Sequence, residues 1–148
     1  MTHLYEVLAD ETRRWRDAHY VCEKYPAIGE ILDWQVDTES GVMRFLRKPQ
    51  LRALEVYWYL RLVRQTPTIL QLYDQCFPDA DVWLDALGIP DGAFKAAGYS
   101  LDRFWKHLSS DDDYVKKFRL QAVRESLGLE YPSYIFALAM GAGKTVLI

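Results

Sequence analysis

A glycine-rich turn near the carboxyl end constrains the fold of this chain more than any other feature. The turn, residues 141–145, reads Gly-Ala-Gly-Lys-Thr and follows the uncharged apolar run 134–138. Such a run of aromatic, β-branched and aliphatic residues is typical of a parallel strand that is buried on both faces. The two glycines let successive backbone N–H groups converge on a phosphate. The order of strand, turn and further apolar residues therefore predicts a phosphate-binding loop.

Each residue of this loop has an expected role. Gly141, Ala142 and Gly143 would turn their backbone N–H groups toward the phosphates. Lys144 would reach the β- and γ-phosphates, and the Thr145 hydroxyl would hold Mg²⁺. We therefore expect a bound nucleoside triphosphate with Mg²⁺, and Lys144 and Thr145 as the catalytic residues. A Gly-rich tail that merely ends the fold is the alternative interpretation.

A second segment, residues 45–55, reads Phe-Leu-Arg-Lys-Pro-Gln-Leu-Arg-Ala-Leu-Glu. Pro49 is favoured in the first turn of a helix, where its missing N–H is not needed. Gln50 then falls in the same turn, and its primary amide can both donate and accept, as the edge of an adenine requires. The alternative is a Gln50 that only caps its own helix.

Together the two segments resemble superfamily-two helicases and translocases, in which an Arg-x-Tyr-Gln or Arg-Pro-x-Gln element precedes the phosphate loop. The pair formed by residues 47–55 and residues 140–145 is similar to the DEAD/DEAH-type helicase proteins known as type III restriction enzyme subunits. Helicase-type loops usually have Thr or Ser where this chain has Met140. The resemblance implies that Gln50 recognises adenine and that Phe45 or Arg47 lies against the base.

The resemblance also implies a function. It identifies ATP as the nucleotide, with Lys144 and Thr145 holding phosphate and Mg²⁺. The parent protein would be an ATP-hydrolysing DNA helicase or translocase of a restriction or phage-defence system with an associated endonuclease. Its partners would be DNA and a methylase or other subunit. Hydrolysis also needs a carboxylate on a second strand to hold Mg²⁺ and an Arg from a second lobe, so we expect this amino-terminal fragment to be inactive alone.

The fold expectation combines these segments. Because 91 positions separate Gln50 from Gly141, a helical insertion must lie between them. We expect amino-terminal helices with a β-hairpin at 34–45 in residues 1–48, a glutamine-motif helix in 49–66, and the insertion in 67–132. Residues 133–148 would hold the first strand and phosphate loop of a truncated RecA-like α/β domain. The whole is therefore expected to be mainly α.

Hydrophobic periodicity locates the helices in more detail. The first two dozen residues show one amphipathic stripe that must end before Pro26. We expect the other helices at residues 28–34, 49–65, 69–76, 80–87, 101–108 and 112–127. The stretch from Gly88 to Gly98 is expected to be a connection. The insertion should pack continuously with the amino-terminal helices.

Composition is that of a packed globular protein, with 50% hydrophobic and 26% charged residues and a net charge of −3. No apolar run approaches the ~20 residues of a membrane span, and the amino terminus lacks a secretory pattern. We therefore expect a cytoplasmic protein with no membrane partner. Cys22 and Cys76 are expected to be reduced core thiols. His19 and Cys22 could share a metal, but no second pair of ligands accompanies them.

Charge and aromatic patterns leave alternatives open. Residues 44–64 contain six basic residues against the single acid Glu55, and residues 79–113 contain eight aspartates. The basic stretch could meet nucleotide phosphates, nucleic acid or the acidic insertion. The aromatic side chains of the insertion fit a core better than a surface that stacks on bases. A helical module that docks a partner subunit is the alternative function, and a small-molecule kinase is a weaker one.

Overall fold

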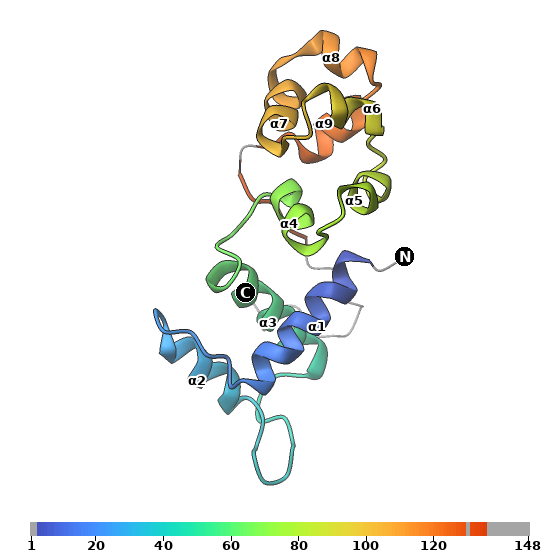
Figure 1. Cartoon of the computed structure of the whole chain (residues 1–148). Helices are drawn as coiled ribbons and strands as arrows, with labels where there is room; N and C mark the ends of the chain where they lie inside the picture. Colours follow the sequence, from blue (N-terminus) through green and yellow to red (C-terminus); the bar gives the residue numbers. More distant parts are fainter. Residues whose placement is uncertain (1–2, 130, 136–148) are drawn as a thin grey trace. The chain divides into compact units, whose positions relative to one another are not determined.

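The chain is mainly helical, as the sequence predicts (Figure 1). The structure is a computed structural model that describes residues 3–129 and 131–135. Within these residues it contains nine helices: α1 (Leu4–Asp17), α2 (Pro26–Trp34), α3 (Lys48–Leu62), α4 (Ile69–Cys76), α5 (Ala80–Ala86), α6 (Asp91–Ala96), α7 (Leu101–Ser110), α8 (Asp112–Lys117) and α9 (Gln121–Leu127). The predicted RecA-like strand and loop fall largely outside this range.

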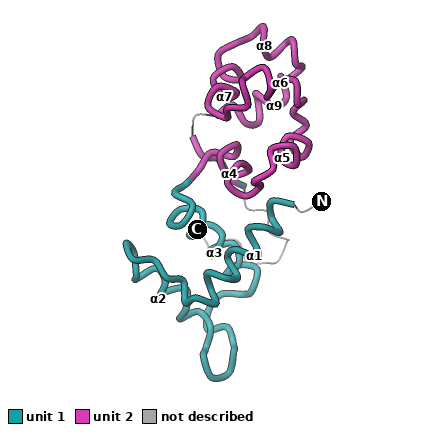
Figure 2. Tube along the Cα trace, viewed as in Figure 1, with its two compact units in different colours: residues 1–66, 135–148 teal, residues 67–134 magenta. Residues whose placement is uncertain are grey.

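The helices divide into two compact units, which Figure 2 shows in different colours. Residues 67–134 form one unit, which we call the insertion unit, with helices α4 to α9. The remaining described residues form the amino-terminal unit, with helices α1 to α3. The predicted insertion is thus a compact unit of its own.

The amino-terminal unit is built on the packing of α1 against α3. Its core consists of Trp15, Tyr20, Leu32, Leu46, Leu51 and Tyr59. The first helix is shorter than predicted because His19 and Tyr20 adopt left-handed φ values of 53° and 52°. The Tyr20 N–H donates to the Trp15 carbonyl at 2.8 Å, which closes the helix end. This turn brings the Tyr20 side chain into the core, where it is 1% exposed.

The predicted hairpin at 34–45 is reduced to a turn with one antiparallel bridge, between Val36 and Met43. The Asp37 carboxylate holds the turn by accepting from the backbone N–H of Ser40 at 2.9 Å. The Asp37 N–H donates to the Val42 carbonyl at 2.9 Å. One bridge buries too little backbone to extend into strands, and the described residues contain no longer ladder.

The insertion unit has strong local helix starts. Side chains cap the first turns of four of its helices by accepting backbone hydrogen bonds: Thr68 for α4, Asp79 for α5, Ser100 for α7 and Asp111 for α8. Its core is aromatic, with Trp83 and Phe94 in edge contact and Phe94 in edge contact with Phe104. The interpretation of these aromatic residues as core is therefore correct for Trp83, Phe94 and Phe104, whereas Tyr99 is 61% exposed.

Two helix boundaries in this unit differ from the prediction. The expected helix 112–127 breaks between α8 and α9, where Arg119 has a φ of 55°. The expected connection between Gly88 and Gly98 contains helix α6. Both changes serve burial, because they place Leu120 and Phe94 in the core at 0% and 5% exposure. The glycines and the proline between residues 88 and 98 predicted a connection, and the charge pattern after residue 111 predicted one long helix. Tertiary packing outweighed both local signals.

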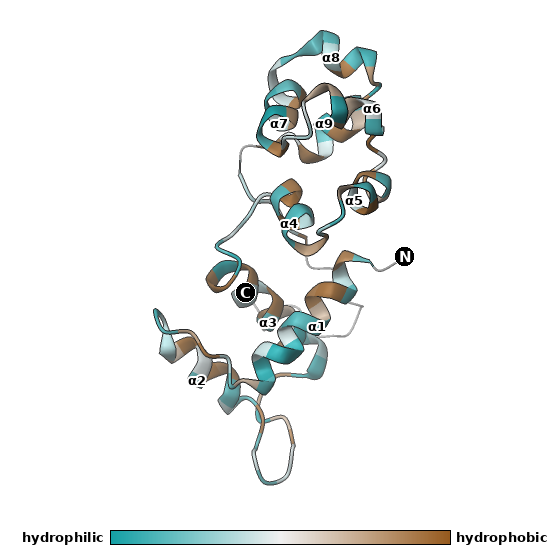
Figure 3. Cartoon of the chain, viewed as in Figure 1, coloured by the Kyte–Doolittle hydropathy of each residue, from teal (hydrophilic) through white to brown (hydrophobic). Residues whose placement is uncertain are grey.

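Hydrophilic and hydrophobic residues alternate along the helices of both units (Figure 3). Among the described residues, none of the helices combines the length and the apolar character that crossing a membrane demands.

Candidate functional site

The predicted phosphate loop, Gly141 to Thr145, lies outside the described residues. Most of the predicted strand, residues 134–138, also lies outside the described residues. Its first two residues, Tyr134 and Ile135, are described and are not in a strand. The Tyr134 hydroxyl instead donates a hydrogen bond to the Pro67 carbonyl. The predicted nucleotide site has two parts, the phosphate loop and the segment around Gln50. Only the second part, at the start of α3, can be described.

Gln50 occupies the third position of α3, in the first turn, as predicted. Its side-chain Oε1 accepts a hydrogen bond of 2.6 Å from the backbone N–H of Arg47, the residue that precedes the helix. Gln50 is only 3% exposed. The side chain therefore caps its own helix, and this contact fixes its orientation. A carbonyl oxygen has two lone pairs, and the cap uses one of them.

The residues around Gln50 alternate between exposure and burial. Phe45 is 72% exposed, Leu46 is buried in the core, and Arg47 is exposed. The buried Leu46 side chain anchors the segment, while a ring and a guanidinium extend from it on the protein surface. Both groups can lie against a planar base, since aromatic rings and guanidinium groups stack on π systems.

Helix α3 is fastened to α1 by a buried carboxylate that sequence reasoning missed. Glu55 is 0% exposed and accepts four hydrogen bonds from three side chains. Arg16 donates Nε and Nη2 at 2.6 and 2.7 Å, the Tyr20 hydroxyl donates at 2.6 Å, and Arg52 Nη1 donates at 3.0 Å. A bidentate guanidinium with two further donors satisfies both oxygens of the carboxylate.

Burial and hydrogen bonds to the Glu55 carboxylate change the pKa values of Tyr20 and Arg16. Burial, together with the hydrogen bond to Glu55, raises the pKa of the Tyr20 hydroxyl well above its usual value. Burial opposes the charge of Arg16, but its hydrogen bonds to Glu55 hold the pKa of the guanidinium above the usual range. Arg16 therefore stays charged and Tyr20 stays protonated at neutral pH. The cluster is a structural clamp that fixes α3 in place.

The basic stretch 44–64 is partly neutralised within its own unit. Three of its six basic residues form ion pairs there: Arg44 with Asp37, Arg52 with Glu55, and Arg64 with Glu11. That the stretch also meets nucleotide phosphates, nucleic acid or the acidic insertion stays a prediction. Lys48 is the first residue of α3 and is exposed, so positive charge remains at the start of this helix.

A second surface feature of the amino-terminal unit combines rings and cations. Lys24, Tyr25, Trp58 and Arg61 line a hollow of about 680 Å³ near the carboxyl end of α3. The Lys24 Nζ lies 5.4 Å from the centroid of the Tyr25 ring. Aromatic faces beside exposed cations are the arrangement that binds single-stranded nucleic acid, through base stacking and phosphate contacts.

The described residues contain no group of three or more His, Cys, Asp or Glu side chains that could hold a metal. His19 Nδ1 instead lies 3.1 Å from a carboxylate oxygen of Asp33. Cys22 and Cys76 do not form a disulfide with each other, and both are only partly buried, so the expectation that they lie in the core is wrong. Thr145, the expected Mg²⁺ ligand, is outside the described residues.

Comparisons with known proteins add no assignment. No protein-family model matches the sequence, and neither a curated protein nor a solved structure is significantly similar to it.

Proposed function

We propose that this chain is the amino-terminal part of an ATP-dependent DNA helicase or translocase of a restriction or phage-defence system. ATP would bind between the phosphate loop, residues 141–145, and the start of α3. The observation that supports this most is the position of Gln50. Its Oε1 is held by the Arg47 N–H, and the exposed side chains of Phe45 and Arg47 precede it closely in the sequence. A held amide would suit the edge of a planar base, and a ring and a guanidinium would suit its faces.

The proposed roles follow from the chemistry of each group. The Gln50 amide would donate to N7 of adenine and accept from its amino group, which a guanine base does not match. Lys144 would hold the β- and γ-phosphates, and the Thr145 hydroxyl would hold Mg²⁺, which neutralises charge on those phosphates. Hydrolysis also needs an Asp-Glu-x-His or Asp-Glu-x-Asp element. The 148 residues contain neither.

DNA would be the substrate of the motor. The hollow lined by Lys24, Tyr25, Trp58 and Arg61 supplies a ring and cation surface within the amino-terminal unit. The net charge of −3 provides no overall attraction for nucleic acid. DNA contact would therefore depend on this local surface and on further parts of the parent protein.

Two substitutions separate adenine recognition from helix capping. Gln50→Glu keeps the oxygen that caps α3, because glutamate serves the same capping position as glutamine. It removes the amide N–H that would donate to adenine. Gln50→Ala removes both. We expect both variants of the parent protein to lose ATP affinity about tenfold or more while GTP affinity changes little. Gln71→Ala is the matched control, because Gln71 caps α4 in the same way.

The outcomes are distinct. ATP binding by Gln50→Glu at the wild-type level would reduce Gln50 to a helix cap. Equal losses for ATP and GTP would show that the substitution acts through the fold. Purified residues 1–148 should not hydrolyse ATP above the level of a Lys144→Ala control, and turnover above that level would contradict the proposed need for a second lobe.

A second candidate is a helical interaction module that docks a partner subunit and has no catalytic activity. The observation that favours it is the number of large apolar side chains on the surface of the amino-terminal unit. Phe45, Trp34 and Ile31 are 72%, 57% and 54% exposed. Loss of partner binding on Trp34→Ala, with ATP binding retained, would support this function.

A further inference from the structure

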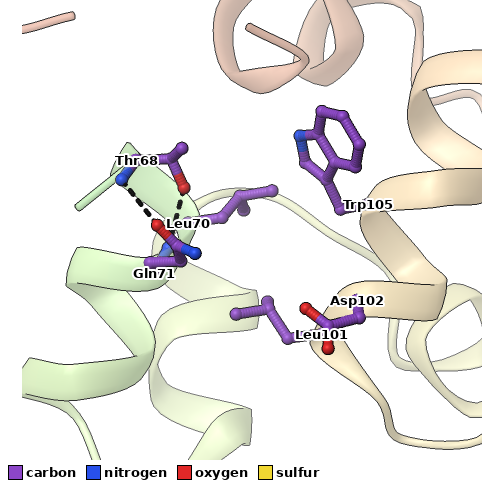
Figure 4. Close-up of a pocket in the computed structure, with 6 residues that line it drawn as sticks. All are labelled: Thr68, Leu70, Gln71, Leu101, Asp102 and Trp105. Atoms are coloured by element: carbon purple, nitrogen blue, oxygen red, sulfur yellow. Dashed lines mark hydrogen bonds between the residues drawn. The ribbon is translucent and has the colours of Figure 1, made fainter. Parts of the chain in front are cut away.

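A pocket of about 260 Å³ lies between α4 and α7 of the insertion unit (Figure 4). Its walls combine apolar and polar side chains: Thr68, Leu70 and Gln71 from the start of α4, and Leu101, Asp102 and Trp105 from α7. Figure 4 shows the side chains of the two helices facing one another across it. All six residues belong to one compact unit, so the pocket is a feature of that unit alone.

The indole N–H of Trp105 is the most informative group in this pocket. Its nitrogen is buried and has no hydrogen-bond partner. In Figure 4 the nitrogen is on the side of the ring that faces Leu70 and Thr68. An unsatisfied buried donor is unfavourable by about 1–3 kcal/mol. The pocket therefore favours a ligand that brings an acceptor, such as a carbonyl oxygen, to this N–H.

Two neighbouring side chains add donors on the opposite wall. Gln71 Oε1 accepts from the Thr68 N–H at 2.9 Å, and the Thr68 hydroxyl oxygen accepts from the Gln71 N–H at 3.4 Å. This reciprocal pair holds both side chains in place. It uses their acceptor atoms, so that the Gln71 amide NH₂ and the Thr68 O–H remain as donors at the pocket wall. Donors therefore face the pocket from α4 and from α7.

The charge at the pocket is negative. Asp102 contributes an exposed carboxylate at the rim. Asp102 is the charged residue among the six that line the pocket. A phosphate-bearing ligand would be repelled by this carboxylate, whereas a basic group next to the bound carbonyl would be attracted.

We propose that this pocket binds an extended, basic peptide segment of a partner protein. One apolar side chain of the segment would fill the space between Leu70, Leu101 and the indole ring. A backbone carbonyl beside it would accept the Trp105 N–H, and a flanking Lys or Arg would lie near Asp102. The size supports a single side chain, because the volume is below the 300–1,000 Å³ typical of pockets for whole small molecules.

This proposal does not depend on nucleotide binding, because none of its residues belongs to the ATP site proposed above. Its test therefore uses separate probes and separate variants.

The test follows the five tryptophan indole N–H signals of the 148-residue chain in ¹H–¹⁵N NMR spectra. Trp105→Phe assigns the Trp105 signal, and Trp34→Phe is a control on the other unit. The probe is the blocked peptide acetyl-Ala-Lys-Leu-Lys-Ala-amide. We expect its addition to move the Trp105 signal downfield with saturation. Replacing the Leu by Ser, or both Lys by Glu, should weaken binding about fivefold or more.

Two variants sharpen the result. Asp102→Asn should abolish the preference for the Lys peptide over the Glu peptide while keeping the preference for Leu over Ser. Asp113→Asn, which changes an exposed aspartate outside the pocket, should leave both preferences intact. The proposal is overturned if the Trp105 signal shows no saturable shift at peptide concentrations of about 10 mM, the weak end of specific binding. It is also overturned if the Leu and Ser peptides bind equally.

Discussion

The two units differ most in what their interiors contain. All four buried polar side chains of the described residues belong to the amino-terminal unit: Thr12, Gln35, Gln50 and Glu55. The buried side chains of the insertion unit are hydrophobic, and its rings form a chain of edge contacts from Trp83 through Phe94 to Phe104. The amino-terminal unit thus buries polar side chains, and the insertion unit is organised by aromatic packing.

This difference shows where function can reside in each unit. Buried polar networks fix groups in one orientation, as the Glu55 cluster does for α3 and the Arg47 N–H does for Gln50. An apolar core provides rigidity without such groups. In the insertion unit the groups proposed to bind a ligand therefore line the pocket between α4 and α7. We therefore expect the two units to respond differently to mutation and to pH.

The largest effect is expected from Glu55→Ala. It leaves the Arg16 guanidinium and the Tyr20 hydroxyl without their buried acceptor, which destabilises the fold by about 3–5 kcal/mol in comparable cases. Hydrogen exchange should show loss of amide protection in α1 and α3, with protection in α7 unchanged. Glu39→Ala, an exposed substitution in the same unit, is the control. Equal loss of protection in α7 would refute independent stability of the units.

Leu108→Ala makes the reciprocal test in the insertion unit. Leu108 is 0% exposed, and truncation of a buried leucine typically costs about 2–5 kcal/mol through lost burial and a residual cavity. We expect amide protection to fall in α7 and α8 and to persist in α3. Retained protection in α7 would mean that the core around Leu108 is less closely packed than the structure shows.

A smaller effect is expected from Gly29→Ala in α2. A Cβ at this position would lie 2.9 Å from the Tyr20 backbone carbonyl oxygen, so α2 or the turn would have to move. Overpacking of this kind costs about 1–3 kcal/mol. Gly92→Ala is the matched control, because its Cβ would have an ordinary contact of 3.7 Å with the Phe118 ring. Urea denaturation should show a loss for the first variant only.

The smallest effect concerns alkaline pH. The pKa of Tyr20 is raised in the folded chain, whereas an unfolded tyrosine ionises near pH ~10. The contribution of this group to stability is therefore present below pH ~10 and is lost as the pH rises toward the folded pKa, by at most about 1.4 kcal/mol per pH unit. Tyr20→Phe should flatten this loss in the amino-terminal unit. Tyr5→Phe, at an exposed tyrosine, should not.

Local signals were sufficient for part of the fold. Helix α4 has the predicted bounds, 69–76, because the cap at Thr68 and the apolar spacing agree. Breaks that depend on tertiary packing were missed. The helix ends at Tyr20 and at Arg119 use non-glycine residues with left-handed φ, and no local pattern distinguishes them. Both breaks place a side chain in the core, Tyr20 in one unit and Leu120 in the other.

The candidate site was predictable to a similar extent. The position of Gln50 in the first turn of α3 follows from Pro49 and was foreseen. The burial of Glu55 was not, because its partners Arg16 and Tyr20 lie 39 and 35 positions away. The available signal was its spacing of four residues from Leu51 and Tyr59, which puts Glu55 on the buried face of α3. A lone acid on an apolar face indicates a buried ion pair.

The most direct test of nucleotide recognition by Gln50 is an NMR titration of the 148-residue chain with Mg-ATP and, separately, with Mg-GTP. The Arg47 amide reports on the site, because its N–H donates to Gln50 Oε1. We predict that ATP at millimolar concentration shifts the Arg47 amide and the Gln50 side-chain NH₂ signals, that GTP shifts them much less, and that signals of α7 stay in place. Unchanged Arg47 and Gln50 signals with ATP, or equal shifts with GTP, would contradict adenine recognition at this site.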